Sequence, residues 1–397
     1  MIRKVRRVSV HEFVFIQYIK SPNIRSLLFF NEFFPAEAFE KSLPLEVLNY
    51  VEEHEDDDCN PLYWILLISG ISAMALKNRG IWRYMFNNFK LLRALNYERT
   101  TGDLFVGFKL PSDIGNLIHL RFLSLKDLEF LWPKLPSSLG NLRYLQTLDL
   151  RVDSDKIHVP NVIWRMEQLR HLYLPFECKS STKLKLGTLR KLLTLVNFNT
   201  KNCYLKDLIN MTNIRELGIN FPFNIENFNE KELGKNPPII GSKYLHSLFI
   251  VATGESCSEI DPRHLVHLLS NCTSICKLSI VANIISELPE YHYFSSHLAY
   301  IRLIGCEFEE DPMPTLEKLP NLRILEFERS FTGKEMFCSA QGFPKLESLI
   351  LAELFKLEEW KVDEGAMPSL QRLEIRHCPE LKMLPEELRL ITKRTEA

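Results

Sequence analysis

The 397-residue sequence lacks an excess of either charge and lacks paired cysteine spacings. Its 49 basic and 50 acidic residues leave a net charge of −1, so no overall positive field favours nucleic acid or an anionic membrane. The nine cysteines are an odd number, scattered without a pairing pattern, which is typical of a reduced compartment rather than of a disulfide framework. The composition therefore predicts a cytoplasmic protein that binds no nucleic acid.

Long apolar runs are also scarce. The most apolar stretch, residues 62–76, is shorter than the roughly 20 residues that a transmembrane helix needs. The basic N-terminus is not followed by an apolar core and a small-residue cleavage site, so we expect no secretory leader. These features disfavour a cell-surface receptor, and we expect no membrane span.

Catalytic and nucleotide-binding motifs are missing. The sequence contains no G-x-x-x-x-G-K-[ST], G-x-G-x-x-G, H-E-x-x-H or G-x-S-x-G. Cys272 and Cys276 have no second pair at zinc-ligand spacing, and His264 and His267 stand among leucines that favour a core helix. We therefore expect no enzyme activity, no cofactor and no metal.

The sequence does contain a repeat of the form L-x-x-L-x-L. Clear copies occupy residues 120–125, 145–150, 169–174, 322–327, 346–351 and 370–375. Weaker copies begin at residues 92, 192, 214, 245, 275 and 298. Most spacings fall within the about 20–29 residues of a leucine-rich repeat. Each block predicts one short strand whose first, fourth and sixth side chains enter a shared core, while the third, fifth and seventh point outward.

The repeat predicts an α/β repeat solenoid. We expect a curved leucine-rich-repeat horseshoe with a parallel β-sheet on its concave face and irregular or short-helical returns outside. Two returns, residues 110–117 and 135–142, share a Leu-Pro-Ser-x-x-Gly-Asn-Leu pattern in which proline ends the extended run. Asp261-Pro262 predicts a capped helix start in a later return.

Three parts are expected along the chain. Residues 1–30 are interpreted as a junction and degenerate first repeat, with strands near residues 6–10 and 24–30. Residues 31–90 do not fit the period and are interpreted as an atypical insertion, an acidic loop plus an apolar helical segment that would form an N-terminal cap. Residues 91–397 are expected to form a leucine-rich-repeat domain of about 12 repeats. The charged tail, residues 392–397, is expected to fray.

The C-terminal stretch resembles a known family. Residues 343–385 contain Glu-Glu-Trp, Gly-Ala-Met-Pro and a closing Cys-Pro-x-Leu-x-x-Leu-Pro, and they are similar to the last repeats of plant coiled-coil-type NLR (NB-ARC-LRR) disease-resistance proteins. Residues 110–121 resemble the early repeats of the same proteins, and residues 6–10 and 24–28 resemble the junction after their nucleotide-binding module. The chain begins where that module would end, so we expect a truncated form that lacks the coiled-coil and nucleotide-binding domains.

The resemblance implies a recognition module of plant innate immunity. Repeats of this family sense a pathogen effector or a guarded host protein and regulate the NLR switch in the defence response. Partners would then be such a protein and an NB-ARC module in cis or in trans. An F-box-type leucine-rich-repeat substrate adaptor of a ubiquitin ligase is the alternative, for which residues 39–48 are a faint echo of an F-box.

The candidate partner surface follows from the outward positions of the blocks. Aromatic residues and arginines are favoured anchors in protein interfaces, although a solvated face with cross-strand charge pairs explains any single residue equally well. The predicted contacts are Asp149, Arg151, His171, Tyr173, Phe249, Tyr300, Arg302, Glu326, Glu328, Arg372, Glu374 and Arg376. Glu326 and Glu328 are expected near Arg302, and Glu374 between its two arginines. Basic residues of the first full repeats, namely Arg121, Lys126 and Arg143, are candidates for an interdomain contact with the switch.

Overall fold

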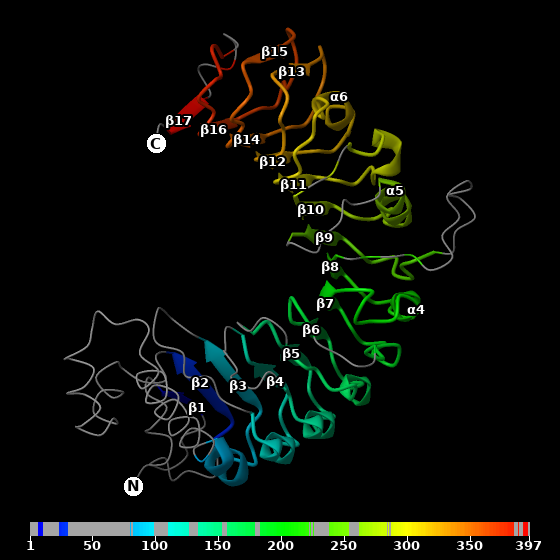
Figure 1. Ribbon diagram of the computed structural model, residues 1–397, viewed down its shortest axis with the longest axis vertical. Coiled ribbons are helices and arrows are strands. Elements are labelled where there is room, and N and C mark those ends of the chain that lie inside the picture. The colour runs from blue at the N-terminus through cyan, green and yellow to red at the C-terminus, as the bar shows by residue number, and fades with distance from the viewer. Residues whose placement is uncertain are drawn as a thin grey trace, which may run out of the picture. The chain divides into compact units, whose positions relative to one another are not determined.

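A computed structural model describes most of the repeat region. The described residues are 7–10, 24–30, 80, 82–98, 110–126, 134–152, 157–178, 183–221, 223, 225, 238–253, 262–283, 285, 287–384, 388 and 392–395. The chain divides into two compact units, unit 1 (Met1–Leu192) and unit 2 (Leu193–Ala397). In each unit, parallel strands lie on one side and the short helices of the returns lie on the other (Figure 1). The predicted α/β repeat solenoid is confirmed. The expected acidic loop, the apolar segment 62–76 and the F-box echo lie outside the described residues.

The described residues of unit 1 contain six parallel strands that pair in chain order. They are β1 (Arg7–Val10), β2 (Ser26–Phe30), β3 (Ala94–Glu98), β4 (Phe122–Ser124), β5 (Thr147–Asp149) and β6 (His171–Tyr173). Leu95, Leu123, Leu148 and Leu172 align across neighbouring strands, so the register matches the sequence repeat. Both early strands that the sequence predicted are present.

The returns of unit 1 are 3-10 helices, η2 (Ser112–Asn116), η3 (Ser137–Asn141) and η4 (Ile163–Arg165). Extended prolines precede the first two, as the sequence pattern predicted. A Cβ on Gly115 would lie 2.7 Å from the Ser138 carbonyl oxygen, so this glycine allows two returns to stack closely. Residues 82–88, which precede β3 in the chain, are helical, and Trp82 and Phe86 of this helix are fully buried.

Unit 2 also contains parallel strands. They are β7 (Thr194–Phe198), β8 (Glu216–Asn220), β9 (Ser247–Ala252), β10 (Lys277–Ala282), β11 (Tyr300–Ile304), β12 (Ile324–Glu328), β14 (Ser348–Ala352), β16 (Arg372–Arg376) and β17 (Thr392–Thr395). The prediction that the tail frays is wrong, because β17 pairs with β16. The tail can pair despite its charged side chains, because an open strand edge offers unpaired backbone N–H and C=O groups to any extended segment.

The core is the one that the repeat predicts. The inward residues Leu123, Leu125, Leu148, Leu150, Leu172, Leu325, Leu349, Leu373 and Ile375 are all at most 4% exposed. One weak repeat departs from the pattern. Asn197 adopts a left-handed φ of 61° and the register shifts between Leu195 and Phe198, so Phe198 rather than residue 197 faces Ile219 in the core. The extra residue in this block is the reason for the bulge.

The returns of unit 2 mix helices and strands. The helices are α4 (Lys206–Ile209), α5 (Pro262–Asn271), η6 (Tyr291–Tyr293) and α6 (Met313–Leu316). Helix α5 begins at the predicted proline, and His267 is buried on it. Two later returns instead form a two-stranded parallel sheet of β13 (Glu335–Cys338) and β15 (Glu359–Val362), so the expectation of irregular or helical returns is wrong there. Both segments alternate buried and exposed side chains, which suits a strand. Among the described helices, none is long and apolar enough to cross a membrane.

Candidate protein-binding surfaces

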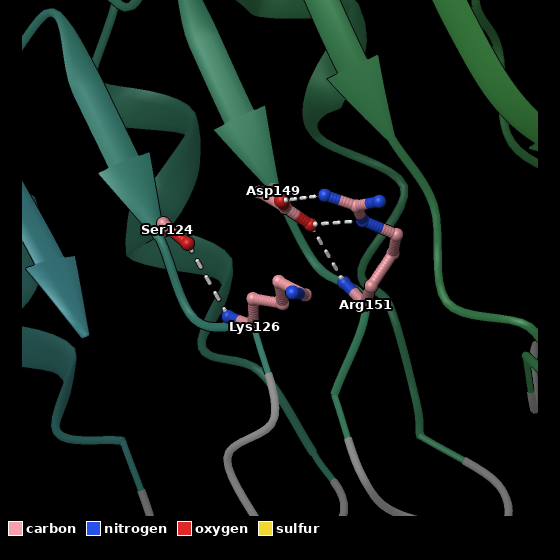
Figure 2. A network of polar contacts seen from close by, with 4 residues as sticks. All are labelled: Ser124, Lys126, Asp149 and Arg151. Atoms are coloured by element: carbon pink, nitrogen blue, oxygen red, sulfur yellow. Dashed lines mark hydrogen bonds and ion pairs between the residues drawn. The ribbon is translucent and has the colours of Figure 1, made fainter. Parts of the chain in front are cut away.

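The sheet face, formed by the outward side chains of the strands, carries a polar cluster in unit 1 (Figure 2). Asp149 accepts hydrogen bonds from three N–H groups of Arg151, at 3.1 Å from the backbone N, 3.0 Å from Nε and 2.6 Å from Nη2. On the neighbouring strand, the Ser124 hydroxyl accepts the Lys126 backbone N–H at 3.4 Å. The Arg151 guanidinium also lies 4.5 Å from the centre of the Tyr173 ring. The strand ends thus hold a cation and an aromatic ring in fixed positions.

The sequence predicted that Asp149 is exposed, and this expectation of exposure is wrong. Asp149 is 6% exposed, because Arg151 folds back over its carboxylate. Its side chain positions the arginine, and Arg151 and Tyr173, both half-buried, form the surface that a partner would meet. His171 lies at the start of β6, beside Thr147 of β5, and is half-buried as well.

A second cluster covers β11 and β12 in unit 2. Arg302 pairs with Glu326 at 3.1 Å across the two strands, as expected. Glu328 does not reach Arg302 and instead lies 4.0 Å from Arg329. Burial raises the pKa of Tyr300, and the carboxylate of Glu326 raises it further through charge and a hydrogen bond. Tyr300, Arg302 and Glu326 therefore form one connected polar surface.

The arginines of β16 flank their glutamate as the sequence predicted. Glu374 lies 2.5 Å from Arg372 and 3.1 Å from Arg376. Arg372 is well exposed and Arg376 is half-buried, and exposed pairs such as that of Arg372 stabilise a fold by only about 0–1 kcal/mol each. Such pairs hold long side chains in one arrangement.

An apolar strip lies beside the second cluster. Phe249 of β9 is half-buried, and Val251, Val281 and Ile304 stand in one row across β9, β10 and β11. Gly218 of β8 lies opposite Phe249 in the register, and a Cβ at this position would lie 3.2 Å from the Val196 side chain. Sequence reasoning missed the three aliphatic residues, although apolar side chains at the seventh position of successive repeats were a visible signal.

The basic rim lies at the N-terminal ends of the unit 1 strands, in the turns before them, and in the last turn of unit 1 at residues 190–191. It comprises Arg25, Lys90, Arg93, Arg121, Arg143, Arg170, Arg190 and Lys191. Backbone hydrogen bonds stack the strand-entry residues, since the N–H of Arg93 bonds to Arg25 O and that of Arg121 to Arg93 O, both at 2.7 Å. Gln146 and Arg170 continue the same ladder.

The structure separates the three candidates for an interdomain contact. Arg121 and Arg143 both belong to the basic rim, whereas Lys126 lies beyond the opposite end of β4, beside Ser124. Sequence reasoning missed Arg93 and Arg170, which occupy the second position of their blocks. In the described chain, Arg93, Arg121, Arg143 and Arg170 form no ion pair.

Five of the described cysteines are buried in the core, namely Cys203, Cys272, Cys306, Cys338 and Cys378. Cys306 and Cys378 approach backbone carbonyls, Cys306 Sγ at 3.6 Å from Ile304 O and Cys378 Sγ at 3.3 Å from Arg376 O. Burial raises the pKa of Cys272, Cys306 and Cys338 to about 12, which keeps these thiols protonated. Among the described residues, no three His, Cys, Asp or Glu side chains come together in a way that could hold a metal ion.

An open cleft of about 820 Å³ lies on the outer side of unit 2, along β15. Glu358 at its edge binds Lys334 at 2.6 Å and Lys382 at 2.7 Å, in the repeats on either side. Hydrogen bonds to the two ammonium groups lower the pKa of Glu358 to about 2. This link joins three successive returns and lies away from the sheet face.

Comparisons with known proteins agree with this architecture. The family model for a leucine-rich repeat region matches residues 72–389. The chain is 36% identical over its whole length to probable disease resistance RPP8-like protein 4 of Arabidopsis thaliana, and 39% identical over 79% of its length to disease resistance protein RPP8 of the same plant. It spans 42% and 33% of the length of these two relatives.

Among solved structures, a leucine-rich repeat protein of Leptospira interrogans is similar in fold. The TM-score is 0.51 at 17% identity, over 98% of this chain and 89% of that one. A fold of this kind is a scaffold for protein interactions. The family model and the plant relatives together lead to one assignment. The chain belongs to the leucine-rich repeat region family, in the form carried by plant NLR disease-resistance proteins.

Proposed function

We propose that this chain is a recognition module of plant innate immunity that acts in the cytoplasm. Its repeats bind a pathogen effector or a guarded host protein and regulate an NLR nucleotide-binding switch. The observation that carries the proposal is the sheet face, where the buried Asp149 carboxylate and the Arg302–Glu326 ion pair hold arginine and tyrosine side chains in place before any partner arrives. Similarity to disease-resistance proteins supports the same function.

Partner binding is assigned to two parts of the sheet face. In unit 1, Arg151 and Tyr173 offer a guanidinium stacked on a ring. In unit 2, Tyr300 and Arg302 stand beside the apolar strip of Phe249 and its neighbours, so a partner meets aromatic, aliphatic and charged groups together. Interfaces concentrate binding energy in such anchors surrounded by weaker contacts.

Contact with the switch module is assigned to the basic rim, in cis or in trans. Arg121 and Arg143, with the neighbouring Arg93 and Arg170, offer unpaired cations that suit an acidic surface on the NB-ARC module. Lys126 is assigned to the sheet face instead, because it lies at the other end of its strand.

The first experiment tests the sheet face with a partner identified by proximity labelling in plant cells. We expect Tyr300→Ala and Arg302→Ala to weaken its binding about tenfold each, the effect of losing about 1.4 kcal/mol per anchor. Arg323→Ala is the matched control, since Arg323 also forms a cross-strand ion pair, with Glu347 at 2.8 Å, but lies at the strand entry. If Tyr300→Ala and Arg302→Ala bind the partner as tightly as the control Arg323→Ala does, this part of the sheet face is not a binding surface.

The second experiment tests the rim with a purified NB-ARC module from a related disease-resistance protein. Charge reversal at Arg121 and Arg143 should abolish a salt-sensitive association, whereas Arg215→Glu, at the strand entry of β8 in unit 2, should not. Association that survives the double reversal would contradict the assignment of the switch contact to the rim.

A further inference from the structure

The two-stranded sheet of β13 and β15 lies on the outer side of unit 2, and its β13 edge is closed by carboxylates. The Phe337 N–H donates to Asp311 Oδ2 at 2.7 Å, and the Ser339 N–H donates to Glu317 Oε2 at 2.8 Å. These two side chains take the backbone donors that an added strand would need. A further strand therefore has no free partner on the β13 side.

The edge of β15 that points away from β13 lacks such a closure. The N–H groups of Glu359 and Asp363 bond to carbonyls of the β13 segment, each at 3.0 Å. Alternate residues of a strand direct their backbone groups to opposite neighbours, so those of Trp360 and Val362 point away from β13. Within the described chain, these groups form no hydrogen bond. The edge of β15 is thus open.

The next return begins a third strand and then leaves it. The Glu358 N–H bonds to Lys334 O at 2.8 Å, and one repeat later the Lys382 N–H bonds to Glu358 O at 3.2 Å. In the described residues no further bond of this ladder follows at Met383. The cleft of about 820 Å³ is lined by β15 and by residues 382–384, so it occupies the place where a third strand would continue.

The cleft contains more carboxylates than ammonium groups. Its charged residues are Glu335, Glu358, Glu359 and Asp363 against Lys334, Lys361 and Lys382. Glu358 takes up two of the lysines, so Glu335 and Glu359 share Lys361, at 3.1 and 3.2 Å. The side chains of Glu335 and Glu359 remain 66% and 55% exposed. This excess of exposed negative charge favours a ligand with cationic groups.

The faces of β15 define where the side chains of a ligand would lie. Glu359 and Lys361 are exposed, whereas Trp360 is buried and Val362 half-buried. In a strand added beside β15, alternate side chains would lie next to the exposed carboxylate and next to Val362. Met383, at the opposite wall, is 72% exposed and offers a further apolar contact. Basic and aliphatic residues in alternation suit the two faces.

We propose that the open edge of β15 binds an extended segment of a partner protein as a third strand, with basic and aliphatic side chains in alternation. In this mode of recognition, backbone hydrogen bonds supply affinity and alternate side chains supply specificity. The site lies away from the sheet face and from the basic rim. It therefore goes beyond the recognition function proposed above and does not depend on it.

The first test uses the full chain and a short synthetic peptide of alternating lysine and valine. We expect it to bind at least tenfold more tightly than a peptide of alternating glutamate and valine. Bound peptide should slow hydrogen exchange of the Val362 amide at least tenfold. The Glu359 amide already bonds to the β13 segment, so its exchange should not change and it serves as the internal control.

Two variants separate strand addition from simple charge attraction. Val362→Pro removes an N–H that faces the cleft, a position where an edge strand tolerates proline, and should weaken peptide binding at least tenfold. Glu359→Lys should weaken it similarly. Glu310→Lys makes the same charge change at an exposed residue next to Asp311, on the closed side of the sheet, and should leave binding unchanged. Exchange of the Asp363 amide checks that the two strands remain paired in each variant.

Peptide binding that survives in Tyr300→Ala would support a site separate from the sheet face. Unchanged exchange at Val362 with saturating peptide would overturn strand addition. Equal affinity for the two peptides would overturn the assignment of a basic ligand. A dimer of the chain alone that protects the Val362 amide and is lost in Val362→Pro would identify a second copy as the occupant and would overturn the assignment to a partner protein.

Discussion

Asp149→Ala should destabilise the C-terminal ends of the unit 1 strands around β5 without altering the leucine core. Asp149 is 6% exposed and accepts three N–H groups of Arg151. One hydrogen bond to a charged group contributes about 1.5–3 kcal/mol when buried. The Arg151 side chain is 39% exposed and can bond to water after the change, so the gain from the ion pair is reduced. We therefore expect a loss of about 2 kcal/mol for Asp149→Ala and about 1 kcal/mol for Asp149→Asn, which keeps one acceptor.

Hydrogen exchange is the suitable assay, because stability in stacked repeats is local and one global unfolding free energy is poorly defined. The amides of Leu125 and Leu150 bond to Asp149 O and Tyr173 O, so they report on the strands at the cluster. A loss of about 2 kcal/mol corresponds to roughly thirtyfold faster exchange at these amides. Glu347→Gln, in a pair with exposed side chains, should change exchange by less than about threefold. Unchanged exchange at Leu125 and Leu150 in Asp149→Ala would refute the view that Asp149 stabilises these strand ends.

Three further predictions address the core, the outer returns and the thiols. Leu325→Ala should cost about 2–5 kcal/mol and lower the unfolding midpoint, since Leu325 is fully buried. Glu358 should titrate near pH 2 by NMR, so its link to Lys334 and Lys382 is present above the ordinary carboxyl range and is lost only as pH falls towards 2; alanine at both lysines should return the pKa towards 4.5. Cys306 should resist iodoacetamide at pH 8 until the chain is denatured, because burial raises its pKa to about 12; rapid labelling of the native chain would contradict this.

The core residues were predictable from the sequence because the spacing of the repeat alone determines which positions are buried. A block that repeats with nearly constant spacing places the same position of every strand at the same depth, as Leu123, Leu148 and Leu172 show. The bulge at Asn197 was not predictable to the residue, since an extra residue in a weak block fits before or after the fourth position. The strands β13 and β15 were missed because four alternating residues are too short to distinguish a strand from an irregular return.

For the candidate site, the sequence could predict only which side chains point away from the core. Alternation along a strand tells which side chains leave the core, and it placed Arg151, Tyr173 and Arg302 correctly on the sheet face. Alternation does not tell what covers an outward side chain. Asp149 is buried by Arg151, two residues along the chain. Glu328 lies near Arg329 and not near the cross-strand Arg302. Both outcomes depend on side-chain conformations that a binary pattern leaves undetermined.

The balance of charge in the composition conceals how the two units differ. In unit 2 the outward arginines pair with glutamates, as Arg302 does with Glu326 and Arg372 with Glu374, so their fields cancel at short range. Within the described chain, Arg93 at the entry of β3 and Arg121 at the entry of β4 form no ion pair, so their field extends into solvent over about a Debye length, roughly 10 Å at 0.1 M salt. Long-range charge mainly changes association rates, whereas desolvated anchors mainly change dissociation rates. A partner that uses both surfaces should therefore lose association rate on rim reversal and gain dissociation rate on Tyr300→Ala, which would separate the two roles by kinetics alone.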